Sequence, residues 1–154
     1  MHEEIKKAYT YATNLLEIKS YSVAKLRDKI LSRYSSDAAD EVINRLITEG
    51  YLNDRKFARH AAEYMAEVKK FGAYRIKKEL FVKGIAKDLI EEVMADIETD
   101  DVDNIIARIK KKYSGNLETP AGEQKIITAM TRYGFKYSDI IKAIKRMKEE
   151  LITL

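Results

Sequence analysis

The stretch FGAYRIKKELFVKGIAKDLIEEVM, residues 71–94, decides the fold class. Its apolar residues recur every three or four positions, which places their side chains on one face of a helix. Gly84 interrupts the pattern after Lys83, at a point where a helix C-terminus accepts both a cation and a left-handed residue. Lys87 and Asp88 then begin a second pattern with an acidic start. The stretch therefore predicts two short helices joined by a tight turn.

The same helix pair occurs three times in the chain. Fifty residues later, Ile126, Met130 and Gly134 stand where the central copy has Ile76, Leu80 and Gly84. Fifty residues earlier the copy has a longer connection, around residues 34–36, and contains Leu26, Ile30, Val42, Ile43 and Leu46. Repeated units of this length bury their apolar faces partly against one another. The sequence predicts an all-α fold of three tandem three-helix repeats, about nine helices, that form an elongated, curved array.

Each repeat is expected to open with one further amphipathic helix. The first covers about Glu3 to Lys19, the second follows Asp54, and the third follows Thr99, which is predicted to cap it. We therefore expect repeat 1 at residues 1–52, repeat 2 at residues 53–98 and repeat 3 at residues 99–154.

Two connecting segments have contrasting compositions. In Gly50-Tyr51-Leu52-Asn53-Asp54 the glycine ends a helix, two apolar residues follow, and Asn53 or Asp54 suits the cap of the next helix. We expect this connector to be docked. Residues 113–119 contain Ser-Gly-Asn and are predicted to be the loosest stretch and a hinge, before Thr119 and Pro120 begin another helix.

The apolar residues that recur at helical spacing, which we call helical stripes, also predict which side chains are buried. Leu80 and Ile90 are expected in the core of the central repeat. The chain has ten tyrosines; Tyr9, Tyr51 and Tyr64 are predicted to be core residues, whereas Tyr11, Tyr74 and Tyr137 lie beside the stripes and are alternatives for partner contacts.

Composition narrows the class of protein. With 45% apolar residues among 154, the chain can bury a core, and a single proline fits a helical protein. The absence of cysteine excludes disulfides and cysteine-bound zinc. The first twenty residues are charged, unlike a secretory signal, and no apolar run is long enough to span a membrane. We expect a soluble, cytoplasmic protein without a membrane partner.

Catalytic chemistry has little support in the sequence. No nucleophile and base, metal-ligand cluster or phosphate-binding loop occurs at recognisable spacing. His60 has no second histidine at helical spacing and is interpreted as a surface or groove-lining residue. The acidic side chains of Asp100, Asp101, Asp103, Glu91 and Glu92 suit helix starts and solvated faces better than metal ligands. We expect no enzyme activity, no catalytic residue, no cofactor and no metal.

Basic residues give a stronger signal. The second helix of each repeat is basic at comparable positions, so that stacked repeats would align these residues in a discontinuous positive stripe. The alternative is that each is simply the solvated side of an amphipathic helix. As candidate partner-binding residues we take Arg27, Arg75, Lys77, Lys78, Lys125 and Arg132.

Three groups of residues carry a resemblance to a known family. They are Tyr21-Ser22 with Leu26 and Lys29; the connector 50–54 followed by Arg55, Phe57 and Ala58; and Gly72, Arg75-Ile76, Glu79-Leu80 and Lys83-Gly84-Ile85. On these residues the chain resembles the RecX family of bacterial recombination regulators, essentially throughout its length and most strongly between residues 20 and 94. It departs from the family pattern at Asn53, where the family tends to have Asp, and at Ala73, where it tends to have Pro.

The resemblance implies a non-enzymatic modulator that lies in the helical groove of RecA polymerised on single-stranded DNA. Such a protein is expected to inhibit the filament's ATP hydrolysis and strand exchange, in DNA repair, recombination and the SOS response. The implied partner is the RecA filament, bound by a monomer, with single- or double-stranded DNA as a further candidate. The rival hypotheses are a direct DNA-binding helical module without a recombinase partner, which the modest net charge of +4 does not favour, and a structural adaptor.

Overall fold

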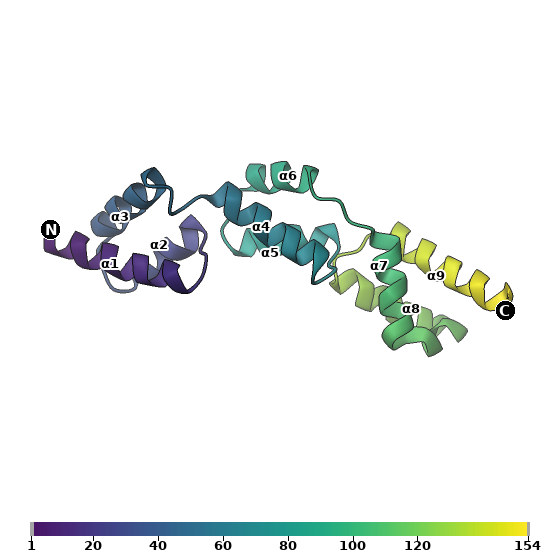
Figure 1. Ribbon diagram of the computed structural model, residues 1–154. Coiled ribbons are helices and arrows are strands. Elements are labelled where there is room, and N and C mark those ends of the chain that lie inside the picture. The colour runs from purple at the N-terminus through teal and green to yellow at the C-terminus, as the bar shows by residue number, and fades with distance from the viewer. Residues whose placement is uncertain (1, 154) are drawn as a thin grey trace. The chain divides into compact units, whose positions relative to one another are not determined.

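The computed structural model describes residues 2–153, and within this range the chain forms nine α-helices and no strand (Figure 1). The helices are α1 (His2–Ile18), α2 (Val23–Leu31), α3 (Ser36–Thr48), α4 (Asp54–Glu67), α5 (Ala73–Val82), α6 (Lys87–Ala95), α7 (Asp101–Arg108), α8 (Pro120–Arg132) and α9 (Tyr137–Thr153). The all-α prediction and the helix pairs read from residues 71–94 are confirmed.

The helices pack into two compact units. The first compact unit comprises the residues up to 61 together with 79–95, and the second comprises 62–78 together with 96 onward. The division therefore passes through α4 and α5, each of which contributes to both units. The three repeat boundaries read from the sequence, and the curvature of the array, stay predictions.

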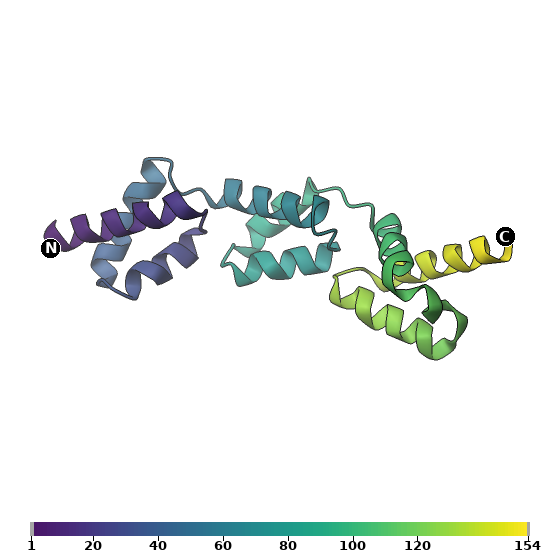
Figure 2. The same cartoon turned by 60° about the horizontal axis from the view of Figure 1, so that its bottom comes forward.

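In the first compact unit, α1, α2 and α3 pack around a core of small and branched side chains (Figures 1 and 2). The core includes Ala8, Ala12, Leu26, Ile30, Val42, Ile43 and Leu46. At its edge the Tyr9 hydroxyl donates to both carboxylate oxygens of Glu49, at 2.9 and 3.0 Å. The alanines of α1 let the other two helices approach its axis closely, since they carry the smallest side chains in this core.

In the second compact unit, α7, α8 and α9 surround a second core, and a segment predicted to be loose belongs to it. The chain continues from α7 through a π-helical turn, Ile109–Tyr113, into a 3₁₀ helix, Ser114–Glu118. Leu117 of this segment is buried, and Gly122 packs so closely on it that a Cβ there would lie 2.2 Å from the Asn116 carbonyl oxygen. Residues 114–118 are thus helical rather than a loose loop, and Leu117 and Tyr113 pack on the core. The role of residues 113–119 as a hinge stays a prediction.

The predicted start of α8 is confirmed, whereas that of α7 is not. The Thr119 hydroxyl accepts a hydrogen bond from the Gly122 amide at 3.0 Å, and Pro120 occupies the first helical position. At α7 the cap residue is Asp100, one position after the predicted Thr99, and its side chain makes no capping bond.

The connector after α3 contains two apolar residues, and only one of them packs into the protein. Leu52 is buried, whereas Tyr51 is 64% exposed. Gly50 has a φ of +84°, and both following amides donate to the Leu46 carbonyl oxygen, which closes the end of α3. Asn53 caps α4, because its Oδ1 accepts the Lys56 amide at 3.1 Å.

Burial on α4, α5 and α6 agrees only partly with the helical stripes. Leu80 is fully buried and Ile90 nearly so, as predicted. Tyr64 is 52% exposed and Phe81 is 69% exposed, although the pattern placed both with apolar neighbours. The predictions that Tyr51 and Tyr64 are core residues were therefore wrong. A tyrosine can flank a buried stripe while its polar tip stays in water.

The neighbours Leu80 and Phe81 allow a matched test of this packing. Leu80→Ala should lower the free energy of unfolding by about 2–5 kcal/mol, because it removes a fully buried side chain. Phe81→Ala, on the exposed side of the same helix, should change it by less than about 0.5 kcal/mol. Urea unfolding measures both, and a small loss for Leu80→Ala would contradict the burial described here.

Candidate functional site

The N-terminus of α2 is joined to the turn between α5 and α6 by a buried serine. Ser22 is fully buried, and its hydroxyl oxygen accepts the Lys25 amide at 3.2 Å while the hydroxyl donates to the Lys83 carbonyl oxygen. The next residue of that turn is Gly84, with a φ of +84°, and a Cβ there would lie 2.5 Å from the Ala24 Cβ. The serine caps its own helix and holds a turn from the following repeat.

Asp54 adds a second bond at the same place. Its Oδ1 accepts the Val23 amide at 2.8 Å, so that the carboxylate lies at the positive end of α2 instead of capping its own helix, α4. We call the set Ser22, Ala24, Asp54, Lys83 and Gly84 the first joint. It lies wholly within the first compact unit.

The second compact unit contains an equivalent joint built from backbone. The Gly72 amide donates to the Tyr133 carbonyl oxygen at 2.7 Å, and the Tyr74 amide donates to the Gly134 carbonyl oxygen at 3.2 Å. A Cβ on Gly72 would lie 2.3 Å from the Gly134 oxygen, and one on Gly134 would lie 2.3 Å from the Arg75 amide nitrogen. Gly72 and Gly134 stand fifty residues after Ser22 and Gly84, so both joints use the same positions of the repeat.

Two arginines cover the second joint. The Arg75 guanidinium lies 4.0 Å from the ring centroid of Phe71 and 5.8 Å from that of Tyr133. The Arg108 guanidinium lies 3.8 Å from the Tyr133 centroid and donates to the Lys70 carbonyl oxygen at 3.3 Å. Arg75, a candidate for partner binding, is therefore part of the packing of the second joint.

The other candidate partner-binding residues differ in their exposure and in their ion-pair partners. Arg27 pairs with Asp40 of α3 at 2.9 Å. Lys77 is half-buried, whereas Lys78, Lys125 and Arg132 are exposed. Arg75 and Arg132 are brought together, since an Arg75 Nη1 lies 3.5 Å from the Arg132 carbonyl oxygen. Arg27 belongs to the first compact unit and the remaining five to the second. Their role in partner binding stays a prediction.

Arg108 is a site residue that the sequence pattern did not indicate. It lies on the opening helix of repeat 3, outside the second helices in which basic residues were compared. Nothing in the sequence near Arg108 indicates that Tyr133 lies beneath it, because the two are brought together only by the packing of α7 on the turn after α8.

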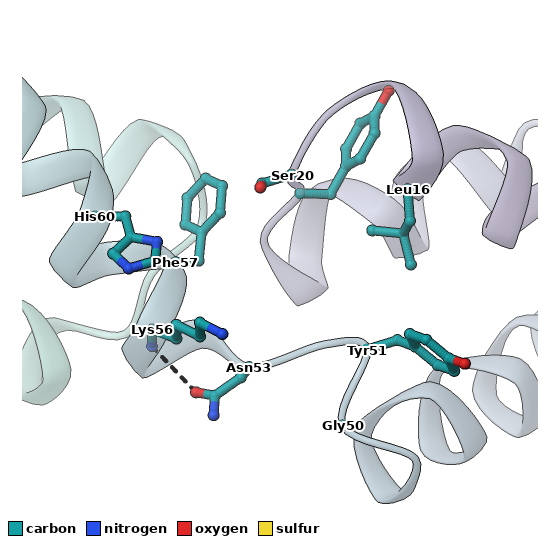
Figure 3. Close-up of a pocket in the computed structure, with 9 residues that line it drawn as sticks. Leu16, Ser20, Gly50, Tyr51, Asn53, Lys56, Phe57 and His60 are labelled. Atoms are coloured by element: carbon teal, nitrogen blue, oxygen red, sulfur yellow. Dashed lines mark hydrogen bonds between the residues drawn. The ribbon is translucent and has the colours of Figure 1, made fainter.

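A cleft in the first compact unit contains the one histidine that sequence analysis weighed (Figure 3). Leu16 and Ser20 lie on one side, Phe57 and His60 of α4 lie on the other, and Asn53 of the connector lies below (Figure 3). None of the nine lining residues is acidic, so no carboxylate in the cleft orients the imidazole for catalysis. His60 is a groove-lining residue, as predicted.

The pKa shifts in this structure have structural causes. Hydrogen bonds from the Ser35 hydroxyl and amide lower the pKa of Glu4, and the hydrogen bond to Glu49 raises the pKa of Tyr9. Burial raises the pKa of Asp101 at the start of α7. These three groups lie outside the cleft and the joints.

Metal ligands and membrane spans were also sought within residues 2–153. This range holds no group of three or more His, Asp or Glu residues that could bind a metal ion. None of its helices is long and apolar enough to cross a membrane.

Comparison with known proteins identifies the family. Residues 8–46 match the family model described as the first three-helix domain of RecX, and residues 53–94 match that of the second three-helix domain. The regulatory protein RecX of Haemophilus influenzae strain PittGG is 31% identical over 147 residues, which cover 93% of this chain and 96% of the relative. The chain belongs to the RecX family. A RecX of Trichlorobacter lovleyi is 28% identical over 142 residues, covering 88% of this chain and 92% of the relative.

Solved RecX structures share the fold. The crystal structure of RecX from Lactobacillus salivarius superposes with a TM-score of 0.83 at 24% identity, covering 96% of this chain and 99% of the other. A second RecX crystal structure gives a TM-score of 0.81 at 18% identity, covering 93% of this chain and 72% of the other. The protein is thus an all-α member of a family of regulatory proteins.

The second joint predicts a strict requirement for glycine at residue 134. Gly50 and Gly134 both have left-handed backbone, with φ of +84° and +91°, but only Gly134 has a backbone atom in the path of a Cβ. Gly50→Ala should cost about 1 kcal/mol of unfolding free energy from strain alone. Gly134→Ala should cost clearly more, as measured by urea unfolding, and equal losses would show that the close approach at the joint does not matter.

The first joint predicts a local effect of Asp54. Asp54→Ala should lower the unfolding free energy by about 1 kcal/mol and speed hydrogen exchange of the Val23 amide, whose acceptor is removed. Asn53→Ala is the matched control, since it removes the acceptor of Lys56 instead. If both substitutions affected only α4, the bond from Asp54 to α2 would be refuted.

Proposed function

We propose that this protein binds in the helical groove of RecA filaments on single-stranded DNA and inhibits their ATPase and strand-exchange activity. The observation that carries the proposal is membership of the RecX family over most of the chain, with relatives named as regulatory proteins. The RecA partner itself comes from the resemblance of the motif residues. In this proposal the protein acts as a cytoplasmic monomer in DNA repair, recombination and the SOS response.

The repeats carry basic side chains that suit such binding. One position of the repeat is basic in all three copies, Lys25, Arg75 and Lys125. A filament presents the same surfaces many times, so cations repeated along the chain would make several weak contacts whose effects multiply. Charged contacts of this kind govern association and partner choice more than folding.

Inhibition in this proposal comes from occupancy. A protein lodged against several recombinase subunits restrains them without performing a reaction of its own. The proposal therefore assigns no catalytic residue and no cofactor to the protein, in keeping with a family of regulatory proteins.

The structure sharpens the choice of residues for a test. Reversing the charge of Arg75 would disturb the second joint, and Arg27 already pairs with Asp40. Lys78 and Lys125 are the better choices, because both are exposed on the candidate helices α5 and α8.

Lys78→Glu with Lys125→Glu should weaken binding to RecA filaments by about tenfold or more and lessen inhibition of ATP hydrolysis, with helicity unchanged. Lys142→Glu with Lys145→Glu, exposed on α9, is the control of equal charge change and should bind like the parent. Co-sedimentation with filaments and a coupled ATPase assay measure the two effects. Equal losses for both pairs would mean that net charge, not these positions, governs binding.

The affinity for single-stranded DNA without RecA distinguishes this proposal from the DNA-binding alternative. If the cations mainly grip phosphates, affinity for single-stranded DNA alone should match that for filaments and fall steeply with salt, through counterion release. If they serve a protein groove, filaments should be bound clearly more tightly at moderate salt. Equal binding to both, without any effect on ATP turnover, would overturn the regulator proposal.

A further inference from the structure

A groove runs beside α2 in the first compact unit, next to the cleft of Figure 3, with which it shares Ser20, Tyr21 and Phe57. Its volume is about 520 Å³, which falls in the range of roughly 300–1,000 Å³ typical of binding clefts. Lys25, Lys29 and Ser32 line it from one face of α2, and Val82 and Lys83 line it from the end of α5. The first joint fixes these two walls, since Ser22 and Lys83 are bonded across it.

The charge of this groove is unbalanced. Lys19, Lys25, Lys29 and Lys83 line it, against the single carboxylate of Asp28. Elsewhere in the same compact unit arginines have partners: Arg27 pairs with Asp40, Arg45 with Glu41 and Arg55 with Glu92.

For the lysines at positions 25, 29 and 83, by contrast, no ion pair occurs among the described residues. Like charges four residues apart on a helix destabilise it by a few tenths of a kcal/mol. Lys25 and Lys29 therefore repel each other across one turn of α2, and an anionic partner would offset this repulsion.

The apolar part of the groove indicates the kind of anion. Val82 is 57% exposed although it is aliphatic, and Phe57 beside it is half-buried. The Tyr21 ring has the Lys19 ammonium 4.8 Å from its centroid. The groove thus combines ammonium groups with an apolar contact at Val82 and Phe57, which suits carboxylates and an apolar side chain of a polypeptide.

We propose that this groove docks an acidic segment of a partner protein, whose carboxylates bind Lys25, Lys29 and Lys83 and whose apolar side chain packs on Val82 and Phe57. This goes beyond the proposed function, because the docking site is defined by its own chemistry: of the cations considered there it uses only Lys25, and it involves none of the six candidate residues.

The test uses the full chain and a fluorescent synthetic peptide of glutamates with a central leucine. The peptide should bind saturably, and Lys25→Glu with Lys29→Glu should weaken it by about tenfold or more. Lys6→Glu with Lys7→Glu is the matched control, because both lysines are exposed on α1 of the same compact unit, and it should change affinity little. Val82→Ser, and separately a peptide with serine in place of leucine, should each weaken binding severalfold. Circular dichroism and thermal melting check that every variant is folded.

Three outcomes would overturn the proposed docking site. The first is the absence of saturable peptide binding. The second is equal weakening by both charge-reversal pairs, which would indicate a long-range charge effect. The third is an oligothymidylate of matched charge that binds as tightly as the peptide and is lost with Lys25→Glu and Lys29→Glu, which would make the groove a nucleic-acid site. Filament co-sedimentation of the parent chain, run alongside, tests the proposed function separately, since the parent can bind filaments whether or not the peptide binds.

Discussion

The packing within both compact units depends on a close approach between the N-terminus of one repeat's second helix and the glycine turn of the next repeat. At Gly84 and at Gly134 the backbone is left-handed and the facing residue lies where a Cβ would be. The first and third copies of the pattern each differ at one of these positions. Tyr34 stands where the other two repeats have glycine, and Gly122, in the place of Ser22, packs on its own Asn116. Gly84 and Gly134 thus lie at the close contacts within the two compact units.

Much of this fold could be predicted from the sequence, since helix periodicity, the left-handed glycines and the burial of Leu80 follow from local rules. The exceptions arose where tertiary packing overrides local pattern. Leu117 looked like a loop residue because its neighbours are polar, yet it is buried, and Tyr113 of the same segment packs on the core as well. Tyr51 and Tyr64 were misplaced because a tyrosine at the margin of a stripe fits either environment.

The candidate site was less predictable, because a cation's role is decided by what lies across from it. The sequence could place Arg27 and Arg75 on the second helices of their repeats but could not show that Asp40 or Phe71 lies against them. The same limit applies to Lys25 and Lys29, which the sequence presented as two more basic residues on a helix. Only the fold brings Lys83 and Val82 opposite them and forms a groove.

The two joints differ in how they can change over time. The hydrogen bonds of the first joint come from side chains, a serine hydroxyl and an aspartate carboxylate. A point substitution at either residue can therefore weaken or redirect one bond without placing new atoms against the backbone. The second joint is made by main-chain atoms on both sides, and any residue other than glycine at 72 or 134 introduces a methylene where backbone already lies. Variation between related sequences can therefore tune the Ser22 and Asp54 bonds of the first joint gradually, whereas a side chain at Gly84 of the first joint, or at either glycine of the second, meets a steric barrier.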